Sequence, residues 1–149
     1  MKKLVLQRII STTALLAAMS FTGLASAHTV PGSLGIKASA VDVFTTTCSK
    51  NAAGATGKFL TKVKGVTKKG PLVSVKVIKG KLASNTTDKI NGDAVYSPDG
   101  IIKAGGEGAY TVSVSKTGAG MMNYVLETHC QTAKATHSGQ TEPKQTQNQ

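Results

Sequence analysis

The sequence has no tryptophan, only 3 tyrosines and 3 phenylalanines, and a single arginine at position 8. Acidic residues are also few, 7 against 18 basic ones in 149 residues, and no segment keeps a sustained helical period. These absences exclude a coiled coil and, in so short a chain, a multidomain enzyme. They also exclude sequence-specific nucleic-acid recognition as a favoured function, because that relies on arginine forks and aromatic stacking.

The long apolar run of the sequence lies at its N-terminus and has the pattern of an export signal. A basic segment ending at Arg8 precedes the apolar stretch 9–24, and Ala25-Ser26-Ala27 is the small-x-small motif that a signal peptidase accepts. Polar residues inside the run argue against a retained membrane anchor. The sequence therefore predicts a cleavable signal peptide over residues 1–27, no transmembrane span after processing, and a periplasmic or secreted protein that begins at His28.

The processed chain would contain 122 residues (149 − 27), which is the size of one domain. Its net charge would be +8, from 15 lysines and 7 acidic residues. With 16 glycines in the whole sequence and few aromatic residues, the composition suits short strands and turns better than long helices.

Two cysteines, Cys48 and Cys130, are separated by 82 positions (130 − 48). Outside the reducing cytosol such a pair is most simply a disulfide. A redox-active or metal-binding pair usually has close spacing such as Cys-x-x-Cys, which this sequence lacks. We therefore predict one structural disulfide.

From Val41 onward, apolar and polar residues alternate with period two in short segments bounded by turn-forming residues, as in antiparallel strands. This pattern predicts an all-β protein, an antiparallel β-sandwich of jelly-roll or Ig-like type with about seven or eight strands. Both cysteines would point inward and tie the two sheets together. The clearest expected strands are Val41–Cys48, Lys58–Lys64, Leu72–Lys79, a segment around Tyr110–Val114, and Met122–Cys130.

The flanks of this predicted domain, which covers residues 41–132, are less regular. Residues 28–40 read either as an extended lead-in or as an additional edge strand. Residues 133–149 carry no large apolar side chain, so they would bury too little surface to order themselves, and the sequence predicts a polar, disordered tail.

The order of these segments resembles the bacterial pre-peptidase C-terminal domain, a small secreted sandwich found beside peptidases. The resemblance covers Val41 to Cys130 and rests on these pieces: Val41-Asp42-Val43-Phe44, the strands at 59–63 and 73–77, Gly108–Val114, and the closing Asn123-Tyr124-Val125-Leu126. No peptidase is attached here, and the long-range cysteine pair is extra. The resemblance implies a secreted accessory or surface-binding module, and it implies no catalytic residue in this chain.

His28 is the first candidate for metal binding. Cleavage after Ala27 would give this residue a free amine beside its imidazole, and two such nitrogens can chelate Cu(II). A second imidazole could come from His129, expected on the outer face of the last strand, or from His137 in the expected tail. The alternative is that His28 is simply the residue next to the cut and His129 an exposed strand residue. The cofactor that these histidines suggest is copper.

A second candidate is an oxygen-rich cluster that could hold Ca²⁺. The spacing does not match an EF-hand, because lysine and isoleucine stand where ligands would be needed. Turn-forming Asx residues are the alternative explanation. The cluster consists of Asp88, Asn91, Asp93 and Asp99.

A third candidate is a basic face on one sheet. Lysines are concentrated between positions 58 and 81, where strand alternation turns most of them outward, and such a field attracts polyanions. The alternative is a solvated surface whose edge lysines prevent aggregation. The lysines are Lys58, Lys62, Lys64, Lys68, Lys69, Lys76, Lys79 and Lys81.

The sequence shows none of the common catalytic motifs, such as Gly-x-Ser-x-Gly or His-Glu-x-x-His. The leading hypothesis is therefore an exported, non-enzymatic binding or accessory module whose lysines engage an anionic glycan or envelope surface. The alternative hypothesis is a periplasmic copper-binding protein that uses the mature N-terminal histidine.

Overall fold

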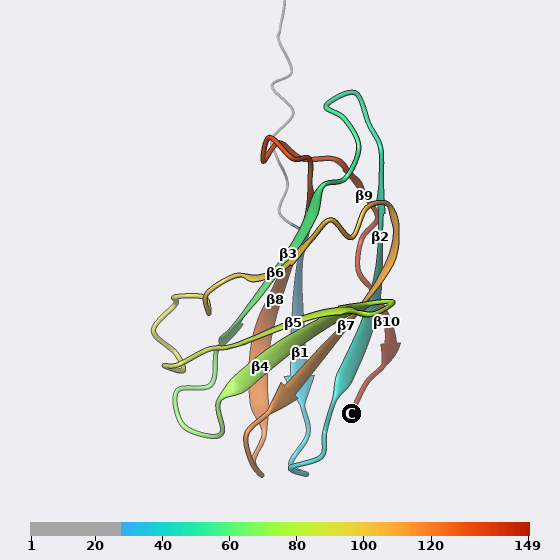
Figure 1. Cartoon of the computed structure of the whole chain (residues 1–149). Coiled ribbons are helices and arrows are strands. Elements are labelled where there is room, and N and C mark those ends of the chain that lie inside the picture. Colours follow the sequence, from blue (N-terminus) through green and yellow to red (C-terminus); the bar gives the residue numbers. More distant parts are fainter. Residues whose placement is uncertain (1–27) are drawn as a thin grey trace, which may run out of the picture.

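The structure is a computed structural model that describes residues 28–149, which form two antiparallel β-sheets packed face to face (Figure 1). The predicted signal peptide lies outside the described residues. The first sheet, sheet A, has the strand order β1-β8-β3-β6. Its strands are β1 (His28–Leu34), β8 (Met122–Gln131), β3 (Lys58–Gly65) and β6 (Gly100–Lys103).

The second sheet, sheet B, has the order β10-β2-β7-β4-β5, and β9 also pairs with β2. Its strands are β10 (Lys144–Gln147), β2 (Asp42–Ser49), β7 (Gly108–Lys116), β4 (Val73–Lys79), β5 (Leu82–Thr87) and β9 (Gly139–Gln140). The prediction of an all-β antiparallel sandwich is confirmed, although residues 28–149 hold ten strands rather than seven or eight. No helix capable of crossing a bilayer occurs within residues 28–149.

The core forms where the alternating strands turn their apolar residues toward each other. Phe59 of β3 and Tyr110 of β7 are fully buried and stack across the two sheets, with ring centroids 4.4 Å apart. Strands β4, β7 and β8 add a layer of buried valines together with Leu126 and Met122. The period-two pattern read from the sequence thus marks the residues that hold the sheets together.

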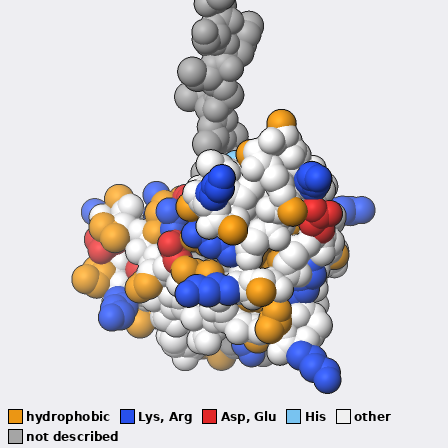
Figure 2. All heavy atoms as spheres, turned by 45° about the horizontal axis from the view of Figure 1, so that its top comes forward, with side chains coloured by type: hydrophobic (Ala, Val, Ile, Leu, Met, Phe, Trp, Pro, Cys, Tyr) orange, Lys and Arg blue, Asp and Glu red, His pale blue; other side chains and the backbone are white. Residues whose placement is uncertain are grey.

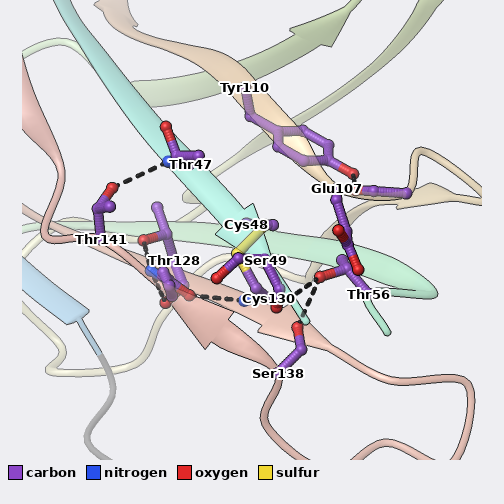
Figure 3. Close-up of a disulfide and its surroundings, with 12 residues drawn as sticks. Thr47, Cys48, Ser49, Thr56, Glu107, Tyr110, Thr128, Cys130, Ser138 and Thr141 are labelled. Atoms are coloured by element: carbon purple, nitrogen blue, oxygen red, sulfur yellow. Dashed lines mark hydrogen bonds between the residues drawn. A yellow bond between two sulfur atoms is a disulfide. The ribbon is translucent and has the colours of Figure 1, made fainter. Parts of the chain in front are cut away.

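The disulfide joins Cys48 of β2 to Cys130 of β8, with the two Cα atoms 5.6 Å apart (Figure 3). Because β2 belongs to sheet B and β8 to sheet A, the bond links the two layers, as predicted. Phe59 lies opposite Cys130 in the β3–β8 ladder, so the disulfide and the aromatic stack occupy the same end of the core.

The edge of sheet A is completed by β1, so residues 28–34 form an edge strand rather than an irregular lead-in. The segment 133–149 differs from the disordered tail that the sequence predicted. It contributes β9 and β10, and the backbone of Gln149 bonds to both Gly35 and Asp42. Backbone groups and glutamine amides make these contacts, so counting large apolar residues does not detect them.

Residues 137–149, which we call the C-terminal strap, cross from sheet A to sheet B over the disulfide end (Figure 3). The Ser138 amide donates to the Cys130 carbonyl at 3.0 Å. Two residues later Gln140 pairs with Cys48 in the β2–β9 ladder. The strap therefore touches the strands of both cysteines.

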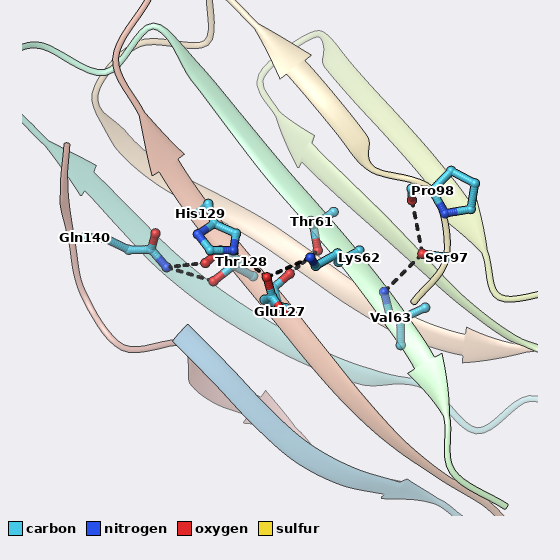
Figure 4. A network of polar contacts seen from close by, with 9 residues as sticks. All are labelled: Thr61, Lys62, Val63, Ser97, Pro98, Glu127, Thr128, His129 and Gln140. Atoms are coloured by element: carbon cyan, nitrogen blue, oxygen red, sulfur yellow. Dashed lines mark hydrogen bonds and ion pairs between the residues drawn. The ribbon is translucent and has the colours of Figure 1, made fainter. Parts of the chain in front are cut away.

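The side chain of Gln140 acts as an additional peptide group on the edge of β8 (Figure 4). Its Oε1 accepts from the Cys130 amide at 2.6 Å, and its Nε2 donates to the carbonyl and hydroxyl oxygens of Thr128. We expect Gln140→Ala to lower the free energy of unfolding by about 1 to 3 kcal/mol, because it leaves a part-buried amide without its acceptor. Urea unfolding would measure the loss.

The matched control is Gln145→Ala, whose amide makes an exposed bond to Gln147 within the same strap. That change should cost less than about 0.5 kcal/mol, as surface substitutions usually do. Equal losses for the two variants would show that the Gln140 bonds do not fasten the strap.

Candidate metal centre

The three histidines of the sequence gather at the end of the sandwich where the strap crosses. His28 starts β1 directly opposite Thr128, so its side chain lies on the inner face of sheet A with that of Thr128, whereas His129, the next residue of β8, lies on the outer face. His137 forms a bridge with Gln131, and its ring meets the ring of His129 edge to face with centroids 5.0 Å apart. The return of the strap along β8 thus brings the His137 ring against that of His129.

His129 has one engaged ring nitrogen and one buried nitrogen. Its Nε2 lies 2.6 Å from Oε1 of Glu127, two residues earlier on the same face of β8 (Figure 4). A carboxylate only accepts hydrogen bonds, so Nε2 carries a proton, and in the neutral ring Nδ1 is then the nitrogen with the lone pair. Within the described part of the chain, Nδ1 is buried and has no hydrogen-bond partner.

Glu127 fixes this tautomer and is itself held in the charged form. Its Oε1 lies 2.9 Å from Nζ of Lys62 on β3 as well as near His129. Burial raises the pKa of Glu127, but the hydrogen bonds and charges of His129 and Lys62 outweigh burial and leave the pKa below its ordinary value. A carboxylate that orients a histidine through its far nitrogen is the usual support of a metal-binding imidazole.

His137 is kept neutral by its surroundings. Burial lowers its pKa, and the charges that His129 and His28 carry when protonated lower it further. The neutral ring offers a lone pair, which is the form that binds metal ions.

His28 is anchored through Nδ1, which lies 2.6 Å from Oε1 of Glu142 in the strap. Its side chain is 17% exposed and that of Glu142 is 76% exposed, so the pair sits at the rim of the cluster. The sequence pointed to all three histidines and missed both glutamates. Strand alternation could have placed Glu127 beside His129, whereas no sequence signal indicates Glu142.

Taken together, the side chains form a partial site. Over residues 28–149, no three His, Cys, Asp or Glu side chains are already arranged as a ready set of metal ligands. What the structure contains is a pair of adjoining imidazoles, one of them oriented by a carboxylate, with a third histidine nearby.

Three of the four predicted calcium ligands form hydrogen bonds with backbone groups. Asp88 is buried and accepts from the amides of Gly65 and Ile90. Asp93 accepts from the amide of Val95, and Asn91 donates to the carbonyls of Gly70 and Pro71. Asp99 is exposed. These contacts match the turn-forming alternative.

The lysines between residues 58 and 81 do not share one face, which corrects the expectation of a single basic sheet. Lys58, Lys62 and Lys64 lie on the outer face of sheet A, whereas Lys76 is exposed on sheet B. Between the strands, Lys68, Lys69 and Lys81 fall in loops. On the face shown in Figure 2, lysines are scattered among hydrophobic side chains.

Several of these lysines are also engaged within the fold. Nζ of Lys62 and Nζ of Lys64 lie 4.8 and 4.6 Å from the centroid of the Tyr96 ring. The Lys79 ammonium lies 4.3 Å from the Tyr110 centroid and donates to the carbonyls of Gly106 and Glu107. Such contacts reduce the charge free to meet a polyanion.

Comparison of the chain with protein-family models, curated proteins and solved structures gave no match. The resemblance to the pre-peptidase C-terminal domain therefore stays a prediction.

Proposed function

We propose that this is an exported, non-enzymatic protein that binds a divalent transition metal, Cu(II) foremost, through the adjoining imidazoles of His129 and His137. The observation that carries the proposal is the buried Nδ1 of His129, which has no hydrogen-bond partner among residues 28–149, in a ring that adjoins the ring of His137.

A metal ion accounts for features that are otherwise unfavourable. Burying a polar atom without a partner costs about 1 to 3 kcal/mol. A metal ion that accepts the Nδ1 lone pair as a Lewis acid would offset this cost. Two neighbouring imidazoles suit Cu, Zn and Ni, and Cu(II) binds most tightly in that series. Export from the cytosol would place the site where Cu(II) is not reduced by the thiol pool.

A lysine-based module for anionic glycans or envelope surfaces is supported less well. An anionic ligand would need a continuous basic face. The lysines are divided between the outer faces of the two sheets, so they do not form one. The proposed metal site needs only the two adjoining histidines at one end of the fold.

The test is a competition titration of Cu(II) with processed protein and with His129→Gln and His137→Gln. Each substitution should weaken Cu(II) binding by at least about 100-fold, because loss of a ligand exceeds the 10- to 100-fold effect of losing a supporting contact. Glu127→Gln should fall within that lower range, since it removes only the carboxylate that orients His129.

The matched control is Lys103→Ala, an exposed cation on β6 of the same sheet. It should leave Cu(II) affinity unchanged. Melting curves without metal would show that each variant is folded. Unchanged Cu(II) affinity in folded His129→Gln and His137→Gln would refute the proposed function.

A further inference from the structure

Four loops gather at the end of the sandwich that lies opposite the disulfide. Loops 35–41, 66–72 and 117–121 form the lower end of the molecule in Figure 1, and 88–95, the first part of the β5–β6 loop, lies beside 66–72. Hydrogen bonds join neighbouring loops of this set: Gly120 amide to Ile36 carbonyl at 2.8 Å, Thr117 amide to Leu72 carbonyl at 2.9 Å, and Asn91 Nδ2 to Gly70 carbonyl at 3.2 Å. The four loops therefore form one surface, which we call the loop end.

The loop end holds the most exposed apolar side chains of the described chain. Each large apolar residue within 28–149 that is at least half exposed lies in one of the four loops: Ile36, Val66, Ile90, Val95 and Met121. By contrast, the loops at the disulfide end, 50–57, 104–107 and 132–138, contain no valine, leucine, isoleucine or methionine. Apolar side chains that gather in this way on an otherwise polar protein mark an interaction surface.

Exposed lysines accompany these apolar side chains. Three of the four loops carry a lysine within three positions of the apolar residue. The lysines are Lys37, Lys68, Lys69 and Lys89, and the exposed acidic residue among the four loops is Asp93. Asp88 is buried and accepts from the Gly65 amide, so it does not meet solvent. The loop end thus presents four cations and one anion beside its apolar side chains.

Shallow hollows open beside two of the apolar side chains. The hollow at Ile36 is lined mainly by small residues together with Lys37, and the hollow at Val66 is lined by Val125, small residues and Lys64. Each hollow combines an apolar wall with a lysine. This combination matches a lipid, whose acyl chains are apolar and whose phosphate is anionic.

We propose that the loop end docks onto an anionic lipid bilayer, with the apolar side chains in the interfacial layer and the lysines at the headgroup phosphates. Apolar side chains partition into the interface, and each lysine near an anionic membrane surface strengthens binding roughly five-fold. An anionic glycan offers charge without an apolar layer, so it would leave the exposed aliphatic side chains in water. A bilayer accommodates side chains that stand on separate loops, because its lipids move around each one.

The docking surface is separate from the proposed metal site. Met122, the first residue of β8, adjoins the loop end, and His129 lies seven positions further along the same strand (129 − 122), a distance of about 23 Å. A bilayer at the loop end would leave the imidazole pair in water. Docking therefore needs no metal ion.

The sequence has no tryptophan, so a single introduced tryptophan reports on one position. The test uses the chain from residue 28 onward, which holds the whole sandwich. Met121→Trp places the probe at the loop end, and Leu82→Trp places it at the opposite end of β5 from 88–95. With vesicles of phosphatidylglycerol and phosphatidylcholine, the emission of Met121→Trp should move to shorter wavelength and be quenched by brominated acyl chains. The emission of Leu82→Trp should not change.

Vesicle sedimentation then measures what single side chains contribute. Ile36→Asp should weaken binding by at least about 10-fold because it removes an inserted side chain, whereas Leu82→Asp should leave binding unchanged. Lys37→Gln should weaken binding roughly five-fold. Its control is Lys76→Gln, on the exposed face of sheet B, which should have no such effect. Melting curves would show that each variant is folded.

Four results would overturn the inference. The first is absence of binding to the anionic vesicles, and the second is equal binding to vesicles of phosphatidylcholine alone, because the lysines would then play no part. The third is a shift of the Met121→Trp emission on raising the protein concentration without lipid, which would mean that a second copy of this chain covers the loop end. The fourth is an equal response from Leu82→Trp, which would mean that the protein adsorbs to vesicles without a preferred surface.

Discussion

Replacing both Cys48 and Cys130 by alanine should lower the free energy of unfolding by about 4 to 5 kcal/mol. The bond closes a loop with a sequence separation of 82 and so removes many conformations from the unfolded chain. Both residues are almost fully buried, and alanine avoids placing an unpaired hydroxyl in the core. Urea unfolding followed by circular dichroism would measure the change.

The control for this prediction is the unaltered protein unfolded with and without a reductant. Reduction should reproduce most of the loss seen in the double variant, whereas the reductant should not affect the variant itself. A loss below about 1 kcal/mol would contradict the prediction, because it would mean that the bond barely restricts the unfolded chain.

Replacing Phe59 by alanine should cost about 3 to 5 kcal/mol. Its ring is fully buried and stacks on Tyr110, which reaches in from the other sheet and donates its hydroxyl to the Gly106 carbonyl at 2.7 Å. The substitution therefore opens a cavity between the layers and removes an aromatic pair. Denaturant unfolding at fixed temperature would give the difference.

Two variants calibrate that loss. Phe59→Leu keeps most of the apolar volume and should be clearly milder than Phe59→Ala. Ile101→Ala on the outer face of β6, where the side chain is 37% exposed, should cost less than either Phe59 variant. If Phe59→Ala and Ile101→Ala were equally destabilising, the stack would not be the centre of the core.

The strands that were predicted correctly are those whose side chains alternate between core and solvent. Alternation in 41–48, 58–64 and 72–79 reflects burial of every second residue, and the structure places β2, β3 and β4 there within one or two residues. Strands β9 and β10 pair with β2 through backbone groups and polar side chains, so no alternating apolar pattern marks them.

Convergence of the candidate site depends on information that a linear pattern does not carry. His28 comes to the same end of the fold as His129 because β1 pairs with β8 in this register, and His137 reaches His129 because the strap turns back along β8. The lysine prediction failed for a related reason. Strands β3 and β4 are consecutive in sequence but belong to different sheets, so their outward residues face in opposite directions.

The pairing of β1 with β8 also has a kinetic consequence. His28 pairs with Thr128 and Leu34 with Met122, so the residues of β1 are separated from their partners by about 90 to 100 positions in the sequence. Proteins dominated by such distant contacts fold in milliseconds to seconds, much more slowly than helical bundles. The sandwich should accordingly be a slow folder whose first strand docks late, after the other strands have already condensed.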